Sequence, residues 1–143
     1  MKNAAIARLE ELIGSWDLVM TNSWFLDSLD ERVDGSATFE WLDESFIVFR
    51  WGLGDEAPAV QVIGYSDAQA RYQVFYHDDR GVARIFDMEL DGNHWTLLRE
   101  DTDFHQRFTA ENLGDRIEAA WDASEDNGVT WRKDFDLIFT RKT

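Results

Sequence analysis

Apolar and polar residues alternate along almost the whole chain after residue 13. In residues 15–20 and 82–90, apolar side chains recur at nearly every second position, which is the period of a β-strand with one buried face. Residues 45–51 are apolar on both faces except at Arg50, as in a strand with little solvent exposure. The pattern predicts ten strands, at 15–20, 36–42, 45–51, 59–65, 71–77, 82–90, 94–100, 103–110, 116–122 and 129–141.

Turn-forming segments such as Asp91-Gly92-Asn93 separate most of these strands. Strands spaced about ten residues apart leave no room for crossover helices, so neighbours pair as antiparallel hairpins. Closing such a sheet hides both of its edges. We therefore expect one all-β domain over residues 1–143, an up-and-down antiparallel β-barrel. Residues 21–34 form a longer connection, which we expect to hold a helical turn and to act as a lid.

A short helix is expected at the N-terminus. Ile6, Leu9 and Ile13 recur at helical spacing. Asn3 can cap this helix and Gly14 can end it. One such helix is too little for a helical domain, so we expect it to cover one end of the barrel.

Residues at the two ends of the strand pattern fit a barrel closed on itself. Gly14-x-Trp16 opens the first strand, and Arg141 ends the last one. In a closed barrel these strands are neighbours, so Trp16 can plug one end while Arg141 covers its ring by a cation–π contact. We expect Trp16 to be buried, with Arg141 close to its ring.

The charge balance argues against some classes of partner. The chain has 29 Asp+Glu against 14 Lys+Arg, a formal net charge of −15 and no basic tract. Nucleic acids and anionic membrane surfaces would be repelled, so we expect neither as a partner. Cysteine is absent, which excludes thiolate chemistry and favours a reducing compartment. With no signal peptide or membrane span in sight, we expect a cytoplasmic protein, and the sequence leaves a homodimer open.

These features resemble the calycin superfamily, which comprises lipocalins, fatty-acid-binding proteins and nitrobindin-like barrels. The resemblance rests on Gly14-x-Trp16 after a short helix, the series of hairpins, and Arg141 in the last strand. Residues 104–108, 121–126 and 131–141 are also similar to a bacterial group of lipocalin-like proteins. The superfamily implies a barrel with an internal cavity for a small, largely apolar molecule, or for haem in the nitrobindin branch.

The sequence does not favour a haem or metal site. Nitrobindin-like proteins take their haem ligand from a strand near the C-terminus, whereas the histidines here are His77, His94 and His105. We expect His105 to point to solvent. Asp122-x-Ser124-x-Asp126 is similar to the start of a calcium loop, but Lys133 stands where such a loop needs glutamate. We expect a hairpin turn there, and no stoichiometric haem, zinc or calcium.

Arg84 is the most informative residue for function, because it lies on the apolar face of residues 82–90. A buried guanidinium is costly unless it is paired or satisfied by a ligand anion. Three interpretations of Arg84 are open. It can form an internal salt bridge, lie at an exposed strand end, or anchor the carboxylate of a ligand. Arg50 is a weaker candidate of the same kind. We expect a ligand cavity lined by Arg84, Gln106, Tyr76, Phe86, Phe108 and Trp121.

These observations predict reversible binding of a small apolar or amphipathic molecule, with an acid group on Arg84. One alternative is an enzyme that uses the same cavity for acid–base chemistry, which needs an inward histidine or carboxylate of shifted pKa near Arg84 or Gln106. Another is an interaction protein whose interior is filled by side chains. The ten Phe, seven Trp and three Tyr make that alternative credible. No catalytic signature is present.

Overall fold

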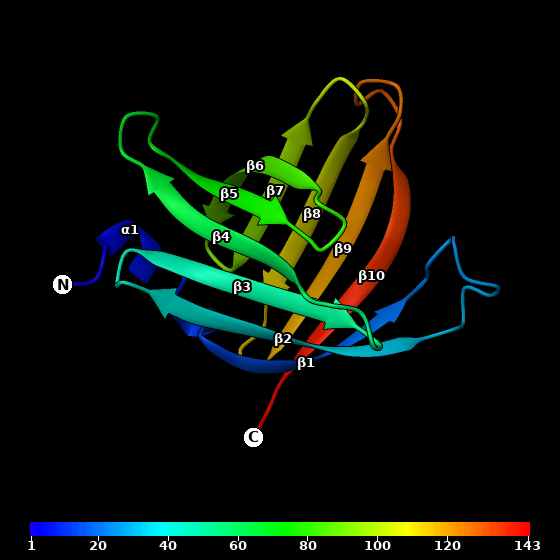
Figure 1. Ribbon diagram of the computed structural model, residues 1–143, viewed down its shortest axis with the longest axis horizontal. Helices are drawn as coiled ribbons and strands as arrows, with labels where there is room; N and C mark the ends of the chain where they lie inside the picture. Colours follow the sequence, from blue (N-terminus) through cyan, green and yellow to red (C-terminus); the bar gives the residue numbers. More distant parts are fainter.

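In the computed structural model, which describes residues 1–143, ten antiparallel strands close into one barrel (Figure 1). Each strand pairs with its neighbours in the sequence, and β1 pairs with β10 to complete the ring. The predicted up-and-down barrel is therefore confirmed. The strands are β1 (Gly14–Thr21), β2 (Val33–Leu42), β3 (Phe46–Leu53), β4 (Ala59–Ser66), β5 (Arg71–His77), β6 (Ala83–Asp91), β7 (His94–Glu100), β8 (His105–Asn112), β9 (Arg116–Ser124) and β10 (Arg132–Arg141).

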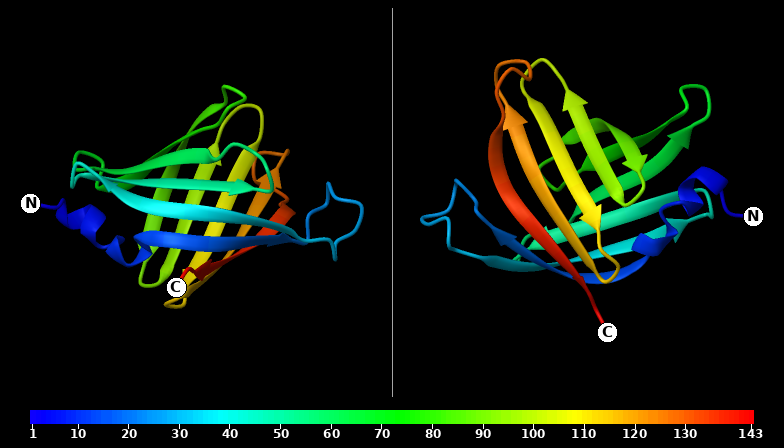
Figure 2. Two further views of the ribbon diagram at one scale, coloured as in Figure 1. Left: turned by 60° about the horizontal axis from the view of Figure 1, so that its bottom comes forward. Right: turned by 180° about the vertical axis from the view of Figure 1, so that it is seen from behind.

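The N-terminal segment covers one end of the barrel (Figure 2). It consists of the helix α1 (Ala4–Ala7) and a 3-10 turn (Glu10–Leu12). The Asn3 side chain caps α1 by accepting a hydrogen bond of 3.1 Å from the Ile6 amide, as predicted. The helix is shorter than the periodicity suggested, because the chain tightens into the 3-10 turn and buries Leu12 in place of Ile13. Neither helical segment is long and apolar enough to cross a membrane.

The pairing of β1 with β10 is reinforced by the predicted contact between Trp16 and Arg141. Trp16 is fully buried, and the Arg141 guanidinium lies 4.2 Å from the centroid of its ring. The same guanidinium donates hydrogen bonds to the carbonyls of Ile13 and Glu11, at 2.9 and 2.6 Å. Gly14 has a φ of +137°, and a β-carbon there would lie 2.9 Å from Arg141 Nη1. Glycine is therefore needed for this close approach.

Aromatic rings fill the half of the barrel next to the N-terminal helix, which we call the closed half. Phe39 stacks on Phe49 with ring centroids 4.3 Å apart, and Trp95 lies 5.0 Å from Phe108. All four side chains are at most 1% exposed. Phe139 packs against the Phe39–Phe49 pair. The side-chain-filled interior considered for an interaction protein thus describes the closed half.

The opposite end of the barrel, which we call the mouth, is formed by five connections. They are residues 22–32, 54–58, 78–82, 101–104 and 125–131, which alternate with the four hairpin turns of the closed end. The first of them contains turns but no helix, contrary to the helical turn expected there. Trp24 anchors this connection to β10. Its backbone amide donates to the Asp134 carbonyl at 3.4 Å, and its indole N–H donates to the Asp134 carboxylate at 3.0 Å.

Replacing Arg141 with methionine tests the closure of the barrel. The change removes the cation–π contact and two charge-assisted hydrogen bonds to backbone carbonyls, so we expect the free energy of unfolding to fall by about 2–4 kcal/mol. Urea denaturation measures this. Arg116→Met is the matched control, since Arg116 makes only an exposed ion pair with Glu118 at 3.1 Å, and we expect less than about 1 kcal/mol there. Equal losses in the two variants would contradict a special role for Arg141.

Candidate ligand-binding site at the barrel mouth

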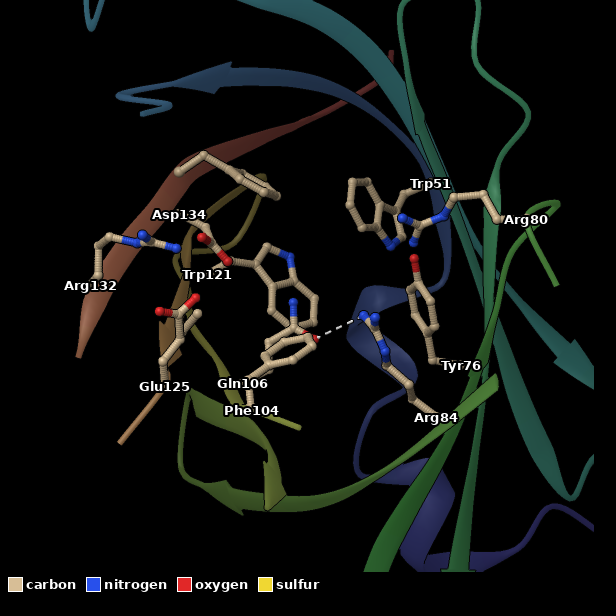
Figure 3. Close-up of a pocket in the computed structure, with 12 residues that line it drawn as sticks. Trp51, Tyr76, Arg80, Arg84, Phe104, Gln106, Trp121, Glu125, Arg132 and Asp134 are labelled. Carbon is tan, nitrogen blue, oxygen red and sulfur yellow. Dashed lines mark hydrogen bonds between the residues drawn. The ribbon is translucent and has the colours of Figure 1, made fainter. Parts of the chain in front are cut away.

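A cavity of about 390 Å³ lies inside the mouth (Figure 3). Its walls combine aromatic rings, among them Trp51 of β3 and Trp121 of β9, with arginines and an amide. A groove of about 790 Å³ adjoins it under the connections 22–32 and 54–58. The two spaces share Trp51, Tyr76, Arg80 and Phe135. The interior is therefore solid in the closed half and hollow at the mouth.

Tyr76, Arg84 and Gln106 all line this cavity. The pairing of β5 with β6 places Tyr76 directly opposite Arg84, and Arg84 Nη1 donates to Gln106 Oε1 at 3.3 Å. Their strands direct these positions inward together with the neighbouring buried residues. Strand alternation thus correctly predicted that these three groups converge on one space.

The three aromatic residues predicted for the cavity occupy two different levels. Trp121 lines the cavity. Phe86 and Phe108 do not, because both are fully buried beneath it. Their ring centroids lie 5.7 and 4.9 Å from that of Trp121. They form the layer of side chains that supports the floor of the cavity.

Arg50, the weaker candidate, lies outside the barrel. Its side chain is 46% exposed and is 3.7 Å from the carboxylate of Glu40. The prediction was wrong because β3 is apolar on both faces, so its alternation did not reveal which face is inward. His105 is also on the outer face, where it is partly covered by the ring of Trp131.

The segment Asp122 to Asp126 ends in a hairpin turn, as predicted. Thr130 donates to the Asp126 carboxylate through both its hydroxyl and its backbone amide, and Ser124 donates through its hydroxyl. These hydrogen bonds lower the pKa of Asp126 to about 2. The carboxylate is therefore committed to the turn and is not arranged as a calcium ligand.

Arg84 is a partly buried cation with no carboxylate partner within 4.0 Å. Its guanidinium carbon lies 5.1 Å from the centroid of Phe104 and 6.0 Å from that of Tyr76. Burial lowers the pKa of Arg84, and the neighbouring charge of Arg99 lowers this pKa further. Because arginine stays protonated in proteins, the lowered pKa means that the charged form is poorly compensated. A bound anion would supply that compensation.

The other arginines around the cavity differ from Arg84 in their partners. Arg80 Nε and Nη2 both donate to Oδ2 of Asp78, at 3.1 and 2.6 Å. Arg99 donates to the Phe104 carbonyl at 2.9 Å and lies 2.9 Å from an oxygen of Asp103. Arg132 is exposed and lies over the ring of Trp24, which it approaches to 4.4 Å. Arg84 is thus the inward cation left free to bind a ligand.

Tyr76 and Asp78 form a hydrogen-bonded pair whose protonation is fixed at neutral pH. The Tyr76 hydroxyl donates to Asp78 at 2.9 Å. Hydrogen bonds from Arg80 hold the pKa of Asp78 well below its usual range, whereas burial raises the pKa of Tyr76 to about 12. General acid–base catalysis needs a pKa near the working pH, so this pair does not supply the acid–base group that the enzyme alternative requires.

Four buried side chains at or beside the cavity have polar atoms without a hydrogen-bond partner. The atoms are the indole N–H groups of Trp51 and Trp121, both amide atoms of Gln61 and the Nε of Arg99. Gln61 is fully buried and lies opposite Tyr76 in the register of β4 and β5. Unpaired buried polar groups are rare in folded proteins, so their concentration in one region of the interior makes that region a candidate binding site.

Trp51, Arg80 and Gln61 were missed from the sequence. Arg80 lies in a connection between strands, where the alternation of apolar and polar residues does not report which side chains point inward. Trp51 and Gln61 occupy strands that are apolar on both faces, so their direction was ambiguous. Gln61 did carry a usable signal, since it is the single polar residue in Ala59–Ile63.

The residues at the mouth do not fit haem. A haem iron needs a proximal ligand such as histidine, cysteinate or tyrosinate. No histidine lines the cavity, and the chain contains no cysteine. Tyr76 is inward, but its hydroxyl is bound to Asp78 and its pKa is raised.

Comparisons with known proteins support the fold and leave the ligand unassigned. No protein-family model matches the chain, and no curated protein matches it in sequence. The fold is similar to the crystal structure of Rv2717c from M. tuberculosis, with a TM-score of 0.69 and 11% sequence identity over the whole of both chains. This similarity concerns the fold alone, a closed ten-strand barrel. The similarity to a bacterial lipocalin-like group stays a prediction.

Replacing Gln61 with methionine, a residue of similar size, should stabilise the protein. The change removes two unpaired buried polar atoms while keeping the packing, so we expect the free energy of unfolding to rise by about 1 kcal/mol. Urea denaturation measures the difference. Gln73→Met on the outer face of β5 is the control, since Gln73 is only partly buried and bonded to Gln69. A loss of stability in Gln61→Met would show that the amide has a structural partner.

The raised pKa of Tyr76 predicts a loss of stability at alkaline pH. In the unfolded chain tyrosine ionises near its ordinary pKa of 10.0, whereas folded Tyr76 keeps its proton up to about 12. The stabilisation of the folded state that follows from this raised pKa is therefore complete below pH 10 and is lost as the pH rises through 12. Denaturation between pH 9 and 12 should show a steeper decline for the wild type than for Tyr76→Phe. Parallel curves would contradict the assignment.

Proposed function

We propose that the protein reversibly binds a small amphipathic carboxylic acid in the cavity at the mouth of the barrel. The acid group lies against Arg84, and the apolar body lies among the rings of the cavity wall. The calycin-like fold is consistent with ligand binding inside the barrel. The observation that carries the proposal is the state of Arg84, a partly buried cation inside the barrel without a carboxylate partner.

The surroundings of Arg84 suit a carboxylate better than a neutral group. Gln106 occupies one guanidinium nitrogen, at 3.3 Å, and leaves other N–H groups available. Arginine presents a planar fork of donors that matches a carboxylate in two parallel hydrogen bonds. The positive charges of Arg99 and Arg80 both act on Arg84 and lower its pKa. An anion placed there lowers the repulsion among these three groups.

The apolar part of the ligand is accommodated by the other wall. Figure 3 places Trp121 across the space from Arg84 and Trp51. Arg132, Glu125 and Asp134 lie on the side of Trp121, and the two carboxylates there disfavour an anion in that position. The acid group is therefore favoured beside Arg84 and disfavoured beside Glu125 and Asp134, which gives an amphipathic acid one preferred orientation.

Substituting Arg84 by leucine tests this function with two probes of equal shape, 2-naphthoate and its neutral amide, 2-naphthamide. We expect the variant to lose about 1–3 kcal/mol of binding free energy for the acid, the range of a charge-assisted hydrogen bond, and little for the amide. Isothermal titration calorimetry measures both.

Arg71→Leu is the matched control, because Arg71 is exposed on the neighbouring strand and pairs with Asp87 at 3.1 Å. We expect this control to bind both probes like the wild type. The carboxylate assignment is refuted if Arg84→Leu binds the acid as tightly as the wild type does. It is also refuted if the variant loses affinity for the acid and the amide equally.

A further inference from the structure

Resting on the proposed function, we infer that the ligand's apolar body is a flat ring system carrying hydrogen-bond acceptor oxygens, rather than a saturated alkyl chain. The site would thus take oxygenated aromatic acids. Three features of the mouth carry this inference: the depth of the cavity, the nature of its walls, and the unpaired donors within it.

The depth of the cavity limits the length of the ligand along the barrel axis. Trp121 forms part of the lining, and Phe86 and Phe108 pack directly beneath it. Below them the stacked pair of Phe39 and Phe49 continues the solid closed half. Interiors packed in this way do not open for extra methylene groups without strain. A long alkyl chain therefore has no path from the cavity into the closed half of the barrel.

The walls of the cavity are largely planar. Trp51, Tyr76, Phe104 and Trp121 present rings from four different segments of the chain. Flat aromatic faces gain most from flat partners, which stack or meet them edge to face at favourable separations. An alkyl chain gains only non-directional contact from the same walls.

The unpaired donors decide between ring systems. The indole N–H groups of Trp51 and Trp121 are both buried, and no protein acceptor bonds to either. In Figure 3 these two side chains flank the same space. A tryptophan N–H is a donor only, and an acceptor oxygen on a ligand bound between the two rings can satisfy it. Ring carbonyl or ether oxygens meet that need, whereas a hydrocarbon leaves both donors unpaired.

Chromone-2-carboxylate and 2-naphthoate form a suitable pair of probes. Both are flat bicyclic acids of similar size, but only the first carries a ring carbonyl and a ring oxygen. Decanoate provides the saturated acid, and unsubstituted chromone lacks the carboxylate. We expect the wild type to bind chromone-2-carboxylate at least about tenfold more tightly than 2-naphthoate, and decanoate most weakly, as hydrogen bonds to two buried donors imply.

Trp51→Phe and Trp121→Phe keep a ring but remove the donor. The measured quantity is the ratio of the two dissociation constants in each variant, because a ratio is unaffected by a partly unfolded fraction. We expect each substitution to reduce the preference for chromone-2-carboxylate by about three- to tenfold. Trp131→Phe is the control, since Trp131 lies on the outer face beneath Arg107, at 4.1 Å, and its loss should leave the ratio unchanged.

The outcomes separate this inference from the function on which it rests. If 2-naphthoate or decanoate binds as tightly as chromone-2-carboxylate, or the ratio survives both tryptophan substitutions, the inference is overturned and acid binding stands. If the two aromatic acids bind no better than neutral chromone, the proposed function itself is overturned. In ¹⁵N-resolved NMR spectra, the indole N–H signals of Trp51 and Trp121 should move downfield with chromone-2-carboxylate. Unmoved signals would also overturn the inference.

Discussion

The stacking of Phe39 on Phe49, with Trp95 and Phe139 packed against the pair, fills the closed half of the barrel, and the position of the groups at the mouth depends on it. A ten-strand barrel encloses more space than small side chains can occupy, so large rings must fill it or leave a cavity. Here they fill one half. Phe86 and Phe108 form the next layer and pack against Trp121 of the cavity wall. The cavity at the mouth exists because the packed aromatic side chains of the closed half do not extend beyond the layer of Phe86 and Phe108.

The electrostatics of the mouth run against those of the whole chain. The net charge is −15, yet arginines gather around the cavity, and Arg84 is the one that faces inward without a carboxylate. Exposed charges are screened over roughly 8 Å at physiological ionic strength. The acidic surface therefore has little influence inside the mouth, where contacts of about 3 Å decide what binds. An anionic ligand of this protein is selected by short-range contacts and is not drawn in by the overall field.

Much of the fold and part of the site were predictable from alternation. It gave the ten strands, and it placed Tyr76, Arg84 and Gln106 on inward faces that the register brings together. Alternation reports the face of a strand and not the depth along it, so it did not separate Trp121 from the buried Phe86 and Phe108. It also fails where both faces are apolar, which is why the inward Gln61 was missed and the outward Arg50 was considered. Arg80 and Phe104 reach the cavity from connections, whose geometry depends on tertiary contacts.

The pairing of the first strand with the last has a consequence for biosynthesis. The hydrogen bond from Arg141 to Ile13 joins residues 128 positions apart. Chains emerge from the ribosome from the N-terminus onward. Until β10 has emerged, the nascent protein is an unclosed sheet with two free edges, which are sites of unwanted strand pairing. The net charge of −15 makes such intermediates repel one another. A nascent chain that stalls before residue 141 lacks the arginine that reinforces the pairing of β1 with β10.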